Sequence, residues 1–322
     1  MTTPLLDIRN LSVELARATP AKVLDGINLQ LAPGEILGVV GESGAGKSVT
    51  GAAVMRLMTR PLRQSGGEMW FDGARIDTLP EAQMRRLRGK EIAMVFQDPL
   101  TALNPVFTVG QQLIQTIRQH LPLDQSAART RAADLLPEVG FPSPEERLEN
   151  YPPEFSGGMR QRVVIALAVA GEPRLIIADE PTTALDVSIQ AQIIALLVDL
   201  ARTRGMGVVL ITHDMGVVAE ACDRVAVLYA GRVAEVGPVR EVLTSPRHPY
   251  SRGLIASIPR IGARLKELPQ IPGTMPRVDA LPPGCAFALR CPFVMEHCKT
   301  HRPDPTPRGG DVQVACWLEE GQ

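Results

Sequence analysis

Short apolar runs separated by helical patterns dominate the first 240 or so residues of the chain. The most apolar runs are residues 36–40, 92–95, 175–178, 208–212 and 225–228. Runs of this length without alternation are typical of strands buried on both faces. Because helical patterns separate them, the sequence predicts crossover connections and a mostly parallel sheet, hence an α/β fold.

Three other stretches have different patterns. Residues 27–31 alternate apolar and polar positions, as a half-exposed antiparallel strand does, and residues 68–76 contain an Asp72-Gly73 turn that predicts a hairpin. Residues from about 99 to 170 are largely helical in pattern, interrupted by prolines. We therefore expect an antiparallel β subdomain and a helical subdomain beside the parallel sheet.

The composition changes after about residue 245. Twelve of the 28 prolines lie beyond this point, so long helices are not expected there. The same stretch holds Cys285, Cys291, Cys298 and Cys316, whereas Cys222 stands alone in the body of the chain. Such a segment has little apolar material, so a cross-link, a bound metal or a docking surface is expected to stabilise it.

Charge and hydropathy exclude several classes of protein. The formal net charge is -1, which gives no general attraction to nucleic acid or to an anionic membrane. The longest apolar run, residues 163–170, is far shorter than the roughly 18 to 20 residues that span a bilayer. The start of the chain lacks the pattern of a secretory signal. We expect a soluble protein without default disulfides, and no nucleic-acid partner.

Residues 41–48 match the phosphate-loop pattern G-x-x-x-x-G-K-[ST] between a predicted strand and a predicted helix. The glycines allow backbone N–H groups to surround phosphate oxygens, and the following helix presents its positive end. Lys47 is expected to neutralise the β- and γ-phosphates, and Ser48 to bind Mg²⁺. The residues expected to bind nucleotide here are Gly41, Glu42, Ser43, Gly44, Ala45, Gly46, Lys47, Ser48 and Val49.

A second element is the apolar strand that ends in Asp179 and Glu180. Two carboxylates at the carboxyl edge of a parallel sheet lie where ligands bind. Asp179 is expected to hold Mg²⁺ and Glu180 to deprotonate the attacking water. Alone, such a pair is more often a solvated strand end, but the phosphate loop favours the catalytic interpretation.

Gln97 and His213 also follow predicted strands. The Gln97 amide has the chemistry to bind Mg²⁺ or the attacking water, and His213 to reach a γ-phosphate. Each is by itself more typical of a surface or capping residue. We take both as catalytic candidates beside Glu180, and Ser48, Gln97 and Asp179 as the magnesium ligands.

The segment FSGGMRQ at 155–161 precedes a strong helical pattern and is a second anion-binding device. Its candidate residues are Ser156, Gly157, Gly158 and Met159. One nucleotide does not need two such cradles from one chain. We therefore expect this segment to contact a nucleotide held by another subunit.

Together these motifs, with Ala184-Leu185-Asp186 before His213, resemble the ATP-binding subunits of ATP-binding cassette (ABC) transporters. The resemblance implies a P-loop ABC ATPase with a RecA-like parallel sheet core, an antiparallel β subdomain and a helical subdomain at about 99–170. It places the nucleotide-binding domain at 1–245 and a small Pro- and Cys-rich extension at 246–322. In that family two domains enclose two ATP molecules head to tail, and hydrolysis drives transmembrane subunits.

Finer features resemble the dipeptide, oligopeptide and nickel importers within that family. They are the segments FQDPLTALNP at 96–105, THDMGVVA at 212–219, HPYSR at 248–252 and GCAF at 284–287. The resemblance implies a second, different ATPase subunit, two permease subunits, an external binding protein and a place on the cytoplasmic face of the inner membrane. It favours di- or oligopeptides as the transported solute, with nickel or glutathione-like solutes as alternatives.

Similar tails in that branch can carry a [4Fe–4S] cluster, which four thiolates have the right number to bind. Unliganded buried thiols and disulfides remain as alternatives for Cys285, Cys291, Cys298 and Cys316. Their gaps match neither zinc ribbons nor compact ferredoxin runs. Cys222 is interpreted as a small core residue.

Two departures from the ABC pattern are present. Met159 stands where many members carry glutamine, a change common in the importer branch. No aromatic residue occurs between Ala16 and Val23, where members usually stack a ring on adenine, and its loss is expected to cost ~1 kcal/mol.

Three rival classes fit less well. ABC proteins of DNA repair insert coiled coils between phosphate loop and signature, but only 109 positions separate Lys47 from Ser156. Translation-associated members carry two cassettes. A non-hydrolysing nucleotide switch does not require Glu180 and His213.

Overall fold

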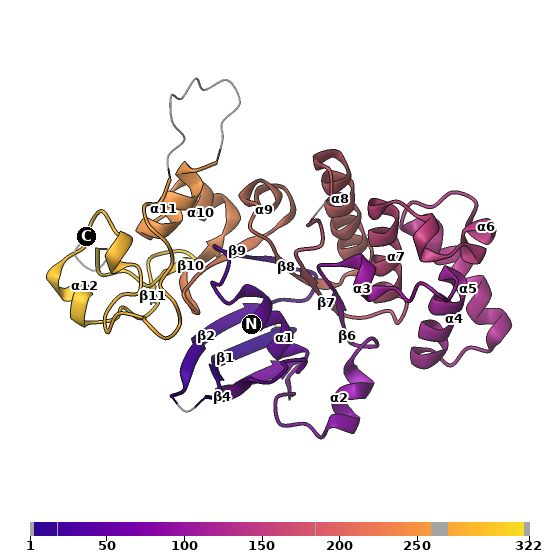
Figure 1. The fold of residues 1–322 in the computed structure, drawn as a ribbon, viewed down its shortest axis with the longest axis horizontal. Helices are drawn as coiled ribbons and strands as arrows, with labels where there is room; N and C mark the ends of the chain where they lie inside the picture. Colours follow the sequence, from indigo (N-terminus) through magenta and orange to yellow (C-terminus); the bar gives the residue numbers. More distant parts are fainter. Residues whose placement is uncertain (1–2, 18, 184, 259–269, 319–322) are drawn as a thin grey trace. The chain divides into compact units, whose positions relative to one another are not determined.

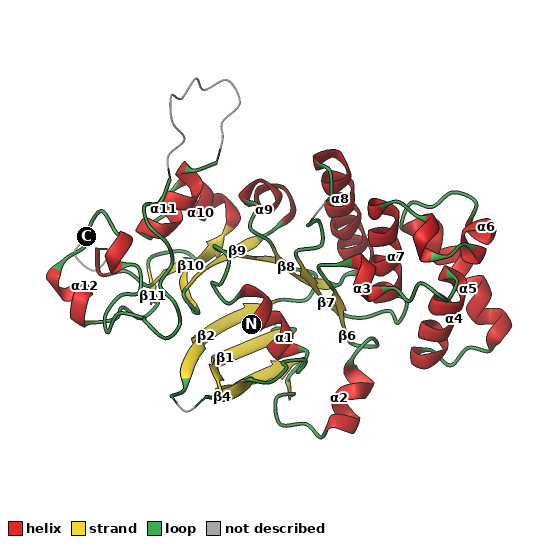
Figure 2. Cartoon of the chain, viewed as in Figure 1, coloured by secondary structure: helices red, strands yellow, loops and turns green. Residues whose placement is uncertain are grey.

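The computed structural model describes residues 3–17, 19–183, 185–258 and 270–318. The chain forms two compact units, one of Met1–Leu31, Leu37–Asp77 and Thr212–Gln322, the other of Ala32–Ile36 and Thr78–Ile211. Figure 1 follows the chain from end to end, and Figure 2 separates its helices from its strands. None of the described helices has the length and apolar character needed to cross a membrane.

The first unit contains an antiparallel sheet of four strands in the order β2-β1-β4-β5. These are β1 (Leu6–Leu15), β2 (Ala21–Leu31), β4 (Leu62–Phe71) and β5 (Ala74–Arg75). The alternation at 27–31 and the hairpin with its Asp72-Gly73 turn are confirmed. Strands β2 and β4 begin earlier than the sequence pattern predicted, because β1 pairs with both of them along its whole length.

A second set of strands in the first unit has the order β11-β12-β10-β9-β3. They are β3 (Ile36–Val40), β9 (Arg224–Tyr229), β10 (Arg232–Pro238), β11 (Thr306–Pro307) and β12 (Gln313–Val314). β3 and β9 are parallel and buried, as two apolar runs predicted, whereas β10 turns back antiparallel. The extension thus contributes two strands to the unit that carries the phosphate loop.

The helices of the first unit are short. They are α1 (Lys47–Val54), α9 (Met215–Ala221), α10 (Val239–Thr244), α11 (Pro249–Ala256), the 3₁₀ turn η2 (Ala288–Arg290) and α12 (Glu296–Thr300). The prediction that no long helix follows residue 245 holds in the described part of the extension. Pro249 begins α11, where its missing N–H costs nothing.

The second unit contains the parallel strands β6 (Ile92–Val95), β7 (Leu175–Asp179) and β8 (Gly207–Ile211), with β7 between the other two. The three apolar runs are confirmed to within one residue. Its helices are α2 (Glu81–Leu87), α3 (Pro99–Ala102), α4 (Val109–His120), α5 (Gln125–Glu138), α6 (Pro144–Glu149), η1 (Pro152–Glu154), α7 (Gly157–Val169) and α8 (Val187–Arg204). The expected helical segment at 99–170 therefore forms as several helices, and Pro137 lies inside α5 and not at a break.

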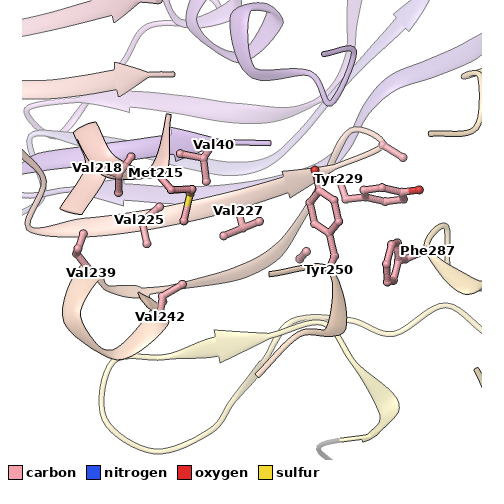
Figure 3. Close-up of a cluster of buried hydrophobic side chains, with 12 residues drawn as sticks. Val40, Met215, Val218, Val225, Val227, Tyr229, Val239, Val242, Tyr250 and Phe287 are labelled. Carbon is pink, nitrogen blue, oxygen red and sulfur yellow. The ribbon is translucent and has the colours of Figure 1, made fainter. Parts of the chain in front are cut away.

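Aromatic side chains of the extension complete the core of the first unit. Tyr250 and Phe287 pack against Tyr229 at the end of β9, with ring centroids 4.6 and 5.2 Å from that ring. Figure 3 shows these three rings beside the valines of β9 and α10. Cys222 packs against this cluster but is only partly buried, so the prediction of a core residue is confirmed only in part. Tyr250 and Phe287 of the extension are thus part of the same hydrophobic cluster as β9 and α10.

The start of α11 is fixed by a buried polar arrangement. The ring Nδ1 of His248 accepts a hydrogen bond from the backbone N–H of Tyr250 at 3.0 Å. The backbone N–H of His248 donates to the fully buried Glu235 carboxylate, also at 3.0 Å. Burial lowers the pKa of His248 to about 4. The imidazole is therefore neutral in the folded protein.

This burial predicts a loss of stability in mild acid. Below pH 6.5 the unfolded chain protonates His248 while the folded chain does not, so the free energy of unfolding falls by about 3 kcal/mol between pH 6.5 and 4. Chemical denaturation across this range measures it. His248→Gln is expected to flatten the pH dependence, leaving the part due to His120, whose pKa burial and Lys90 also lower. An unchanged slope contradicts the assignment.

Candidate nucleotide site

The phosphate loop joins β3 to α1 in the first unit. Gly46 stands before the helix at φ 101°, and a Cβ there would lie 2.5 Å from Leu24 Cδ2, so glycine is required on both grounds. Ser43, Gly44 and Ser48 are exposed along the loop, whereas Lys47 is 5% exposed. Its Nζ donates to the carbonyls of Gly41 and Glu42, at 2.9 and 3.2 Å. The loop thus joins a buried strand to the start of a helix, as the sequence predicted.

The carboxylates lie at the carboxyl end of the parallel strands in the second unit. Asp179 ends β7 and is 8% exposed, and Glu180 follows it with φ 45°. A non-glycine residue in the left-handed region carries about 1 kcal/mol or more of strain, which is typical of functional positions. The Glu180 N–H donates to the carbonyl of Ile211 at 2.9 Å. The backbone is thus held in the conformation that places the Glu180 carboxylate at the sheet edge.

Gln97 and Glu180 meet, although 83 positions separate them. The Gln97 Nε2 donates to Glu180 Oε2 at 3.4 Å, and the Thr183 hydroxyl donates to the same oxygen at 3.0 Å. Gln97 comes two residues after β6, which pairs with β7 in parallel, so both side chains start from one edge. Thr183 was missed by sequence reasoning, because a threonine after two carboxylates carries no specific signal.

His213 belongs to the first unit and is exposed directly after Thr212. The Thr212 Oγ1 accepts the Asp214 N–H at 3.0 Å, and the Asp214 carboxylate caps α9. The polar residues on either side of His213 therefore fix the turn that carries it. The phosphate loop belongs to the same unit, whereas Gln97, Asp179 and Glu180 belong to the second.

The Ser-Gly-Gly segment begins α7 as the sequence predicted. The Ser156 Oγ accepts the Met159 N–H at 3.4 Å, and Ser156 and Gly157 are exposed. A Cβ on Gly158 would lie 2.5 Å from Ile189 Cγ2, so α8 packs closely on this turn. The start of α7 is thus exposed, where a second molecule can reach it. Of the Ala184-Leu185-Asp186 motif, Ala184 lies outside the described residues.

The four cysteines of the extension line one cavity, together with Phe287 and Trp317. All five cysteines of the chain are free thiols. Burial, with a smaller effect of the three neighbouring thiols, raises the pKa of Cys316 to about 11. Among the described residues, no group of three or more His, Cys, Asp or Glu is placed to hold a metal ion. The four thiols have the donor type and number of an iron–sulfur cluster, but the described structure does not arrange them as a metal site.

Comparisons with known proteins agree with this geometry. Residues 24–183 match the ABC transporter family, and residues 234–298 match the C-terminal region of oligopeptide/dipeptide transporters. The dimeric ATP-binding cassette MJ0796, in a post-hydrolysis state with ADP and phosphate, superposes with a TM-score of 0.65. It is 27% identical and covers 73% of this chain and 99% of its own. The chain is thus an ATP-binding cassette ATPase.

Two relatives from Bacillus subtilis (strain 168) narrow the assignment. The dipeptide transport ATP-binding protein DppD is 45% identical over 98% of this chain and 95% of its own length. The oligopeptide transport ATP-binding protein OppD is 48% identical over 98% of this chain and 89% of its own. The chain belongs to the family of ATP-binding proteins of peptide ABC transporters.

Proposed function

We propose that this chain binds ATP with Mg²⁺ and hydrolyses it to power the import of di- and oligopeptides. The placement of Glu180 carries the proposal, since its carboxylate is held at the sheet edge by Gln97 and Thr183. A carboxylate oxygen there is available to take a proton from water as the water attacks the γ-phosphate. The proton passes to Glu180, the new bond forms to phosphorus, and the leaving group is ADP.

The phosphate-binding residues supply the charge compensation for this reaction. Lys47, held on the Gly41 and Glu42 carbonyls, is placed to move onto the β- and γ-phosphates. Ser48, Gln97 and Asp179 have the oxygen donors that Mg²⁺ prefers, and His213 has the chemistry to bond the γ-phosphate. When bound, Mg²⁺ neutralises charge on the phosphate oxygens.

The exposed start of α7 supports a paired arrangement of two ATPase subunits. Ser156, Gly157, Gly158 and Met159 complete the partner's nucleotide site, and the partner's equivalent segment completes this one. The further partners are two permease subunits and an external binding protein, with this chain on the cytoplasmic face of the inner membrane. The boundary at residue 245 between nucleotide-binding domain and extension is part of the same proposal.

Solute uptake tests the transport role. Cells lacking this gene are expected to take up labelled di- and tripeptides poorly, and restored expression is expected to recover uptake. Equal peptide uptake with and without the gene, or a defect confined to nickel or glutathione, contradicts the peptide assignment.

We also infer that the four cysteines of the extension hold a [4Fe–4S] cluster. Their thiols line one cavity, and four thiolates are the number that binds such a cluster. When bound, the cluster would cross-link the parts of the extension that carry the four cysteines.

Metal analysis of the full chain tests this inference. Protein purified without oxygen is expected to contain about four irons and four sulfides per chain, with Cys298→Ser losing most of both. Cys222→Ser is the matched control and is expected to retain them. Fresh wild-type protein without iron and sulfide contradicts the inference.

A further inference from the structure

The second residue of the phosphate loop is paired with the C-terminal extension. The Glu42 carboxylate makes a two-pronged ion pair with Arg290, with Nη1–Oε2 at 2.9 Å and Nη2–Oε1 at 3.0 Å. The two residues are 248 positions apart. The Arg290 side chain is 6% exposed, and that of Glu42 is 29% exposed. Two parallel charge-assisted bonds of this kind fix direction as well as distance.

The Arg290 guanidinium has little freedom to follow the loop. Its Nε donates to the carbonyl of Pro272 at 2.8 Å, and its Nη2 also reaches the carbonyl of Ile271 at 3.4 Å. Its Nη1 lies 3.4 Å from the Tyr229 hydroxyl, and its Cζ lies 5.8 Å from the centre of that ring. The extension and β9 hold the Arg290 guanidinium on several sides. Arg290 therefore sets the position of the Glu42 carboxylate.

A second contact from the extension holds the backbone of the same residue. The Glu42 N–H donates to the Tyr250 hydroxyl at 2.9 Å, and Tyr250 is fully buried beside Tyr229 and Phe287 (Figure 3). The Glu42 carbonyl accepts from Lys47 at 3.2 Å. The N–H, carboxylate and carbonyl of one loop residue are thus all bonded, two of them to the extension. Met275 lies beside Gly44, since a Cβ there would be 3.1 Å from the Met275 Cε.

We propose that the C-terminal extension positions the phosphate loop for nucleotide, with Arg290 and Tyr250 as positioning residues that act through Glu42. A phosphate loop binds only when several N–H groups converge, so a loop that must be ordered during binding has a lower affinity. We call the contacts of Arg290 and Tyr250 with Glu42 the clamp. Losing the clamp is expected to raise the dissociation constant for MgATP by about tenfold. The proposal rests on the proposed ATP-binding function.

Calorimetric titration of MgATP into the isolated full chain tests the proposal. Arg290→Gln and Glu42→Gln are each expected to weaken binding about tenfold, and Arg290→Lys, which keeps the charge but not the fork, less. Arg252→Gln is the matched control. This exposed arginine of the extension bonds the Pro246 carbonyl and is expected to bind MgATP as wild type does.

The double variant Glu42→Gln/Arg290→Gln separates positioning from charge. If the clamp positions the loop, the double variant binds no better than the weaker single variant. Wild-type affinity in the double variant means that only the unpaired carboxylate repelled phosphate, and it overturns the proposal. Melting without nucleotide checks folding, and a lower melting temperature with unchanged affinity in Arg290→Gln also overturns it. Wild-type protein without MgATP binding overturns the proposed function itself.

Discussion

Glu180→Gln is expected to reduce ATP hydrolysis by the assembled transporter by about a hundredfold or more, while ATP still binds. The amide keeps the size of the side chain and still accepts a hydrogen bond from Gln97 or Thr183 through its oxygen. It has no basic oxygen to take the proton of the attacking water. The lost interaction is therefore made in the transition state, and ATP is trapped before cleavage.

Phosphate release by the complex, together with the nucleotide retained after rapid gel filtration, measures both effects. Glu172→Gln is the matched control, because Glu172 is an exposed residue of the same unit, paired with Arg131 at 3.3 Å. It is expected to hydrolyse ATP as wild type does. Undiminished hydrolysis by Glu180→Gln in a fully loaded complex removes Glu180 from its catalytic role.

Gly157→Asp is expected to abolish most hydrolysis in the complex, by about a hundredfold, without weakening ATP binding by the isolated chain. A Cβ at Gly157 meets only Leu185 Cδ2, at the ordinary distance of 3.5 Å, and a carboxylate in the first turn favours the helix. The fold of α7 is therefore preserved. A negative charge now stands where the N–H groups of α7 are proposed to meet the partner's triphosphate.

Gly157→Ala is the matched control, since it adds the Cβ without the charge and is expected to retain most activity. Titration of the isolated chain with MgATP and hydrolysis by the assembled complex separate binding in the chain's own loop from completion of the partner's site. Weakened binding by isolated Gly157→Asp contradicts the assignment of this segment to the partner's nucleotide. Full activity in the complex contradicts its role altogether.

Local patterns were sufficient for the strands and turns that carry the chemistry. The apolar run at 92–95 forms β6 with those bounds, and the Ser-Gly-Gly start of α7 lies at the predicted residue. Both depend on interactions within a few residues, namely burial of a short run and capping by Ser156. Strand β1 was missed, because its pairing with β2 and β4 depends on residues far along the chain.

The sequence by itself determined the phosphate loop, the carboxylate pair and the order of the motifs, because each is a short segment with its own hydrogen-bonding requirement. The change of composition near residue 245 also predicted an extension that begins there. Only the tertiary structure brought Gln97 to Glu180, through the parallel pairing of β6 and β7, and there it shares one carboxylate oxygen with the nearby Thr183.

The two-pronged ion pair between Arg290 and Glu42 was also revealed only by the tertiary structure. A lone arginine among prolines and cysteines carries no local signal for a partner 248 positions away. Burial explains the importance of this contact, because a charged arginine side chain that is only 6% exposed needs a partner. Glu42 of the loop is the carboxylate that the fold places there.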